Sequence, residues 1–188
     1  MFVSEADADH ATLKQGDIVS NVHMVGSLSL EHLGISRDAT GKELNWQVLQ
    51  APDYRDVAVL SHSCEVSIAN GVKLTSVILA PIRDINGATQ PDKVQSLIDS
   101  NILVPGTQGS FLKYFYLPAN DKLQAAQGAV VDFSKCFSVR KNSYNHLLSK
   151  KILEMQPQIR EAFALKLALY FHRSQQPAAV PAPGAAAA

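Results

Sequence analysis

The stretch Gly128–Arg140, GAVVDFSKCFSVR, alternates between apolar and polar side chains over most of its length. A period of two is typical of a strand with one face in the core and the other in solvent. The alternation assigns four apolar side chains to the core-directed face: Val131, Phe133, Phe137 and Val139. The opposite face is then expected to be mostly polar, and it carries Val130, Asp132, Ser134, Cys136 and Ser138.

Four other segments predict strands, because each is rich in β-branched, apolar or aromatic residues and lies next to turn residues or proline. They are Gly16–Val22, Val57–Leu60, Val72–Ile85 and Phe111–Leu117. Five short strands separated by turn signals predict a small, mostly antiparallel barrel or a strongly bent sheet.

From Gln158 onward the apolar period changes to four. The repeating residues are Ile159, Phe163, Leu167 and Phe171. This stripe is typical of an amphipathic helix, and Pro157 suits its first turn. Three cations are expected near its C-terminal end, where they favour the helix dipole: Lys166, His172 and Arg173. We also expect helices over Tyr144–Met155 and Asp92–Ser100, so the sequence predicts a β-rich α+β fold with one or two C-terminal helices.

The composition of the flanks suggests the domain boundaries. Residues 1–15 are polar and acidic, which predicts a flexible N-terminal segment, and the mixed stretch Ser29–Asp53 is expected to be peripheral. Residues 175–188 end in PAAVPAPGAAAA, which cannot form a core and predicts a disordered tail. A single globular domain is therefore expected over residues 16–174.

The chain of 188 residues has 17 basic and 17 acidic side chains, so its formal net charge is zero. This balance argues against a protein that binds bulk nucleic acid or an anionic membrane through its overall charge, although it allows a local basic patch. No apolar stretch is long enough to span a membrane, and the acidic start does not resemble a secretory signal. Two cysteines form no disulfide framework, so we expect a cytoplasmic protein with reduced thiols.

The segment Leu60–Val66, LSHSCEV, places a thiol, an imidazole, two hydroxyls and a carboxylate directly after a buried strand. In an extended chain, His62 and Cys64 share one face and leave Ser61, Ser63 and Glu65 on the other. Functional groups are often displayed where the chain leaves a rigid strand. This segment is therefore the main candidate for chemistry.

Three interpretations of Cys64 remain open. It is a nucleophile activated by His62, or one of two metal ligands with His62, or a small buried residue at a strand end. The metal interpretation needs further ligands from His23, His146 or Cys136. Because no close-spaced ligand pair supports it, we expect no metal and, in the absence of a phosphate-binding loop, no cofactor.

Two stretches carry a family resemblance. Gly16-Asp17-Ile18-Val19, followed by Val57-Ala58-Val59-Leu60-Ser61, resembles the opening of the PemK/MazF-type SH3-like barrels. The resemblance implies an SH3-like barrel and an RNA-cleaving toxin. The basic residue of an Arg-Pro pair precedes the second strand in that family, and the corresponding place here reads Arg55-Asp56-Val57.

A longer resemblance runs from about Gly16 to Arg173. It is to a largely uncharacterised bacterial family in which a strand ends in a Leu-Ser/Thr-x-Ser/Thr/Asp-Cys-Asp motif, with Glu65 in place of the aspartate here. The resemblance singles out Cys64, Glu65, Asp132 and Arg173, and it implies a mobile-element or phage-defence context.

These observations lead to two hypotheses. The first is a non-enzymatic module that binds protein or nucleic acid, with its binding residues at Ser61, Cys64, Glu65, Asp132 and Arg173. The alternative is an enzyme, either an RNA-cleaving barrel or a hydrolase centred on Cys64, with the catalytic candidates Cys64, His62, Glu65 and Arg173. The surroundings of the Cys64 thiol distinguish the two hypotheses.

Overall fold

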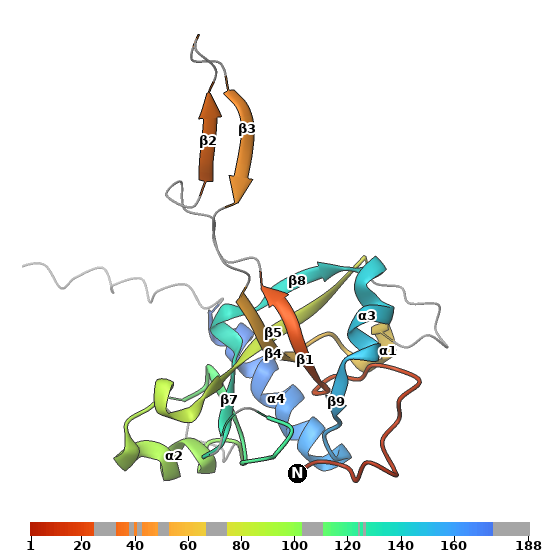
Figure 1. The fold of residues 1–188 in the computed structure, drawn as a ribbon. Helices are drawn as coiled ribbons and strands as arrows, with labels where there is room; N and C mark the ends of the chain where they lie inside the picture. The colour runs from red at the N-terminus through yellow and green to blue at the C-terminus, as the bar shows by residue number, and fades with distance from the viewer. Residues whose placement is uncertain are drawn as a thin grey trace, which may run out of the picture.

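The computed structural model describes residues 1–24, 33–37, 40, 43–48, 53–66, 75–102, 111–123, 125 and 127–174. Seven strands form one antiparallel sheet in the order β6-β7-β5-β4-β1-β9, and β8 pairs with β5 off this path (Figure 1). The strands are β1 (Ile18–Met24), β4 (Asp53–Val59), β5 (Ser76–Asp84), β6 (Tyr114–Leu117), β7 (Ala129–Asp132), β8 (Phe137–Arg140) and β9 (Lys151–Leu153). The predicted α+β class with a mostly antiparallel sheet is confirmed. Within the described ranges no pairing joins β6 to β9, so the sheet is open between them.

The centre of the sheet is β5, which has different partners along its two edges. One edge pairs with β4 in the register Val57↔Pro81. The other edge pairs with β8 over residues 76–79 and with β7 over residues 82–84. A single strand over Gly128–Arg140 is therefore wrong, because a 3₁₀ turn, η5 (Phe133–Lys135), divides it into β7 and β8.

The turn also changes which side chains are buried. Asp132 lies on the expected polar face, yet it is only 1% exposed, and its carboxylate accepts a hydrogen bond from the Ser134 N–H that caps η5. Val130 is fully buried as well. Of the residues on the predicted polar face, three are exposed as expected: Ser134 within the turn, and Cys136 and Ser138 after it.

The long C-terminal helix α4 (Pro157–Ser174) packs on one face of the sheet, as its apolar stripe predicts (Figure 1). Phe163 is fully buried, and its ring meets the rings of Phe115 and Phe133 edge to face at centroid distances of 5.0 and 5.4 Å. Leu167 is also buried, whereas Phe171 is 38% exposed.

Lys166 is the unexpected residue of α4, because it is fully buried rather than placed for the helix dipole. Its Nζ donates to Ser100 Oγ at 2.8 Å and lies 3.5 Å from Asn101 Oδ1. Burial lowers the pKa of the Lys166 amine to about 7. The side chain therefore connects α4 to the end of α2 (Val94–Asp99) through neutral oxygen acceptors.

The remaining helices are short. Helix α1 spans Ser63–Val66, α2 follows the 3₁₀ turn η4 (Pro91–Lys93), and α3 (Tyr144–Ser149) follows the turn η6 (Lys141–Ser143). Another 3₁₀ turn, η3, spans Ile85–Gly87. The expected helix over Tyr144–Met155 is wrong in its second half, where Lys151–Leu153 forms β9 against the edge of β1. None of the helices within the described ranges has the length and apolar character to cross a membrane.

The Gly-Asp pair before β1 fastens that strand to β9. Gly16 has a φ of +85°, and a Cβ there would lie 2.8 Å from Met155 Sδ, so glycine is required at this position. Asp17 is fully buried and pairs with the Lys151 ammonium at 2.8 Å. Burial outweighs this partner and raises the pKa of Asp17 to about 6.

Residues 1–15, for which the sequence predicts a flexible segment, make specific contacts beside β9. Val3 N–H donates to Glu154 O at 2.8 Å, Phe2 forms an isolated bridge with Met155, and Leu13 is fully buried. The stretch expected to be peripheral contains a separate two-stranded sheet of β2 (Leu33–Arg37) and β3 (Glu43–Val48), which stands apart from the main sheet (Figure 1). The predicted tail over residues 175–188 lies outside the described residues.

Candidate functional site

Ser61 has a structural role at the end of β4. It is 5% exposed, and its Oγ accepts a hydrogen bond from Ile78 N–H at 2.8 Å. The preceding residue, Leu60, donates its N–H to Ile78 O at 2.8 Å. The Ser61 hydroxyl thus accepts a hydrogen bond from β5 at the point where the backbone of β4 has turned away. This hydrogen bond accounts for a serine at the position.

His62 and Cys64 meet because the chain does not stay extended after β4. The prediction of alternating faces is wrong, since Ser63–Val66 forms α1. His62 Nδ1 lies 2.9 Å from Cys64 Sγ, and it also accepts a hydrogen bond from Cys64 N–H at 3.3 Å. Both side chains are exposed, so the interpretation of Cys64 as a small buried residue is wrong as well.

The contacts of His62 with Cys64 involve one ring nitrogen. Both the backbone N–H and the thiol of Cys64 lie within hydrogen-bond distance of Nδ1. Glu65 is exposed beside them, and its backbone N–H donates to His62 O at 2.9 Å.

The other sequence-predicted site residues lie elsewhere. Asp132 pairs with Arg83 at 3.0 Å near one end of β5, whereas Ser61 contacts Ile78 near the other end. Five residues of a strand span roughly 16 Å, so these groups do not form one site. Arg173 lies in the last turn of α4, and its side chain is outside the part of the chain that the structure describes.

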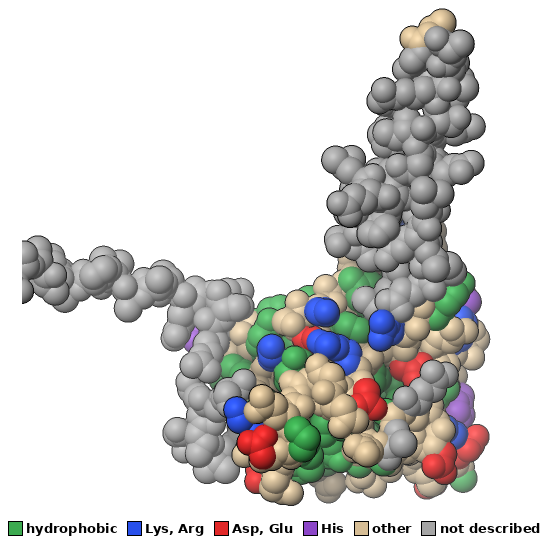
Figure 2. Space-filling view, turned by 60° about the vertical axis from the view of Figure 1, so that its left-hand side comes forward, with side chains coloured by type: hydrophobic (Ala, Val, Ile, Leu, Met, Phe, Trp, Pro, Cys, Tyr) green, Lys and Arg blue, Asp and Glu red, His purple; other side chains and the backbone are tan. Residues whose placement is uncertain are grey.

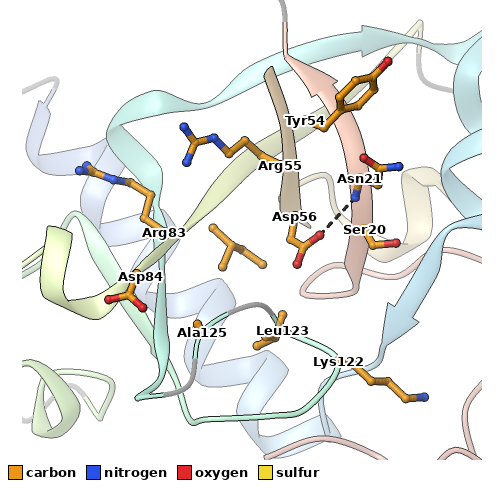
Figure 3. Close-up of a pocket in the computed structure, with 11 residues that line it drawn as sticks. Ser20, Asn21, Tyr54, Arg55, Asp56, Arg83, Asp84, Lys122, Leu123 and Ala125 are labelled. Carbon is orange, nitrogen blue, oxygen red and sulfur yellow. Dashed lines mark hydrogen bonds between the residues drawn. The ribbon is translucent and has the colours of Figure 1, made fainter. Parts of the chain in front are cut away.

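A cleft of about 580 Å³ lies over the ends of three strands, and we refer to it as the β1–β4–β5 cleft (Figure 3). Its lining residues are Ser20, Asn21, Tyr54, Arg55, Asp56, Ile82, Arg83, Asp84, Lys122, Leu123 and Ala125. Its volume falls within the range of roughly 300–1,000 Å³ that is usual for ligand sites.

A bulge in β1 shapes one wall of the cleft. The register of β1 with β4 shifts between Val19 and Val22, and Asn21 there has a φ of +53°. Asn21 N–H donates to Asp56 Oδ1 at 3.2 Å, and Asn21 O accepts from Lys150 Nζ at 2.8 Å. Bulges and left-handed residues are common next to functional sites. The surrounding sheet holds the strained backbone in place there.

Two arginines lie on the rim of the cleft. Arg55 lies near the start of β4 and Arg83 near the end of β5, and both side chains line the cleft. Figure 3 shows the two side chains on the same side of the cleft, with that of Arg55 extending toward Arg83.

An aromatic pair lies on the other side of β4 from the Arg55 side chain, because successive residues of a strand point to opposite faces (Figure 3). Tyr54 is 54% exposed, and its ring lies 5.3 Å from the ring of His23 in the register His23↔Tyr54. Exposed aromatic rings of this kind are surfaces on which unpaired bases stack. Figure 2 shows that Lys and Arg side chains gather on one face of the body, although the net charge of the chain is zero.

This cleft is not evident from the sequence. Arg55 is conspicuous there only through its place in a family motif, and no pattern marks Tyr54 or Arg83. The one local signal is the polar run Asp53-Tyr54-Arg55-Asp56 directly before a buried strand. Its meaning depends on β5 and on the bulge in β1, which are distant in the sequence.

Metal ligation has no geometric support in the described part of the chain, where no three His, Cys, Asp or Glu side chains cluster. His23, which could complete a site with His62 and Cys64, pairs instead with Tyr54. Comparison with known proteins adds no relative: no protein-family model matches the chain, and no curated protein is significantly similar to it.

Proposed function

We propose that this protein is a non-enzymatic binding module that holds a single-stranded segment of nucleic acid in the β1–β4–β5 cleft. The observation that carries the proposal is that Arg55, Arg83 and the exposed Tyr54 all line one cleft. We also propose that the bent sheet is an SH3-like barrel left open between β6 and β9. The bacterial mobile-element or phage-defence context belongs to the same proposal and rests on the family resemblance.

The chemistry of the cleft matches both parts of a nucleotide. Guanidinium groups bind phosphate through two parallel N–H donors, which is the preferred geometry for this anion. The Tyr54 and His23 rings offer a surface for an unpaired base, whose stacking contributes about 1–3 kcal/mol in single-strand binding proteins. An acidic peptide would use the arginines but would gain nothing from the aromatic pair.

The proposal is tested by fluorescence anisotropy with a 5′-labelled 12-nucleotide RNA and the matching single-stranded DNA. We expect Arg55→Met and Tyr54→Ala each to weaken binding about tenfold or more, which corresponds to about 1.4 kcal/mol. Lys93→Met in η4 is the control, because it also removes one exposed cation, but from a residue that does not line the cleft. Equal affinity of all four proteins, or binding of an acidic peptide that Tyr54→Ala leaves unchanged, would contradict the proposal.

The same RNA and protein variants also test RNA cleavage. The cleavage alternative rests on the resemblance to PemK/MazF-type barrels, from which the chain departs at Arg55-Asp56-Val57, where that family has an Arg-Pro pair. The observation that favours it is that Arg55 lines the cleft. If denaturing gels show that the wild-type protein cuts the RNA and Arg55→Met does not, the protein is an enzyme rather than a binding module.

A hydrolase centred on Cys64 is the second candidate, because His62 Nδ1 lies 2.9 Å from the exposed thiol. Cys136 is an internal control, since it is also exposed. For a binding module we expect iodoacetamide to modify both cysteines at similar rates at pH 7. Modification of Cys64 more than tenfold faster than that of Cys136, and abolished by His62→Ala, would instead support the hydrolase.

A further inference from the structure

Asp132 and Arg83 form an ion pair in which the carboxylate is buried and the arginine is partly exposed. Asp132 is 1% exposed, whereas 31% of the Arg83 side chain is accessible and lines the β1–β4–β5 cleft. The Asp132 Oδ2 accepts from Arg83 Nη1 at 3.0 Å, and its Oδ1 accepts from the backbone N–H and the hydroxyl of Ser134. The carboxylate is therefore held firmly in place by η5.

A second contact fixes the orientation of the guanidinium group. Arg83 Nη2 donates to Gly87 O at 3.2 Å, in the turn η3 that follows β5. Asp132 and Gly87 together define the position and the plane of the guanidinium group, which a single contact cannot do. Arginine has five N–H donors, and these two bonds use only two of them.

We infer that Asp132 is a positioning residue, which holds Arg83 so that its remaining donors bind a phosphate group of the bound strand. This inference rests on the proposed function. A carboxylate that only needed a counter-ion would be served equally well by a buried cation, but Arg83 is partly exposed and lines the cleft. Arg83 contacts the backbone of the ligand and not its bases, so binding is expected to depend little on nucleotide sequence.

The experiment measures the affinity for the labelled 12-nucleotide RNA at several NaCl concentrations. Each phosphate contact to a single strand contributes about 0.7 to the slope of log K against log salt. We expect Arg83→Met to weaken binding about tenfold and to reduce this slope by about that amount. Asp132→Asn is expected to do the same although Arg83 is still present, because the amide oxygen is held by the two Ser134 donors and the amide NH₂ then faces the guanidinium group.

Two further variants separate positioning from general damage. The double variant Asp132→Asn/Arg83→Met should bind no more weakly than Arg83→Met alone, because both changes remove the same contact. Ser134→Ala is the milder variant, because it removes the hydroxyl donor to Asp132 Oδ1 but leaves the Ser134 N–H donor and the Oδ2 contact with Arg83 intact, so it should weaken binding less than Asp132→Asn does.

The outcomes distinguish this inference from the proposed function. Wild-type affinity and slope in Asp132→Asn, together with weak binding in Arg83→Met, would overturn the positioning role alone. Wild-type binding in Arg55→Met and Arg83→Met would overturn the proposed function. If circular dichroism shows that Asp132→Asn is unfolded, Arg83→Lys decides, because its ammonium keeps the charge but cannot reach Asp132, Gly87 and the phosphate together. Weak binding of Arg83→Lys supports the inference, and wild-type binding overturns it.

Discussion

Replacing Lys166 with methionine is expected to stabilise the protein at neutral pH. The lysine is fully buried, and its recorded polar contacts are to the neutral oxygens of Ser100 and Asn101. Burial lowers the pKa of the amine. Methionine has a similar length and carries no charge.

The magnitude follows from the pKa of the amine. Burial lowers it from 10.5 to about 7, so between these values the unfolded chain binds more protons than the folded one. Stability therefore rises with pH in this window, and it falls as the pH decreases toward 7. At about 1.4 kcal/mol per pKa unit, the charged form costs on the order of 4–5 kcal/mol at pH 7, and about 3 kcal/mol of this is regained by pH 9.5.

The variant loses the hydrogen bond to Ser100, which contributes about 1 kcal/mol. We therefore expect Lys166→Met to be more stable than the wild type at pH 7 by about 2–4 kcal/mol, with most of this difference gone at pH 9.5. Urea unfolding followed by circular dichroism at several pH values measures it, with Lys93→Met as the exposed control. A difference between the wild type and Lys166→Met that stays constant from pH 7 to 9.5 would refute the reasoning.

Three other changes have defined outcomes. Phe163→Ala should cost about 3–5 kcal/mol in unfolding free energy, because the ring is fully buried between two other rings, and a cost below about 1 kcal/mol would show that α4 is loosely attached. The raised pKa of Asp17 means that the folded protein holds this proton more tightly than the unfolded chain, so the contribution of this group to stability should fall by about 2 kcal/mol as the pH rises from 4 to 6. Asp17→Asn should remove that slope, and a slope unchanged in the variant would contradict the assignment. Truncation after Gln176 should leave the melting temperature unchanged, and a shift of several degrees would show that the tail packs.

Local patterns predicted the parts of the fold that depend on neighbouring residues. The four-residue apolar repeat correctly placed α4, because Phe163 and Leu167 face the sheet in the way that their spacing requires. The same kind of argument failed for Lys151–Leu153, which forms a strand because the edge of β1 is available for pairing. It also failed for Lys166, which lies one residue before Leu167 and is buried by α2, an element about 70 residues earlier in the chain.

The candidate site shows the same limit more clearly. The residues around Cys64 are adjacent in the sequence, so the thiol and the imidazole stand out there. The two groups come into contact only because the chain turns into α1. The cleft, in contrast, forms only when three strands pair. Asn21 at the bulge of β1 lines it, together with Tyr54 and Arg55 of β4 and Arg83 of β5. Asp132 then gains a function from its position, because a buried carboxylate on β7 can orient a cation on β5 only after the two strands have paired. The sequence suggested Asp132 as a ligand contact, and in our proposal it instead supports the contact that Arg83 makes.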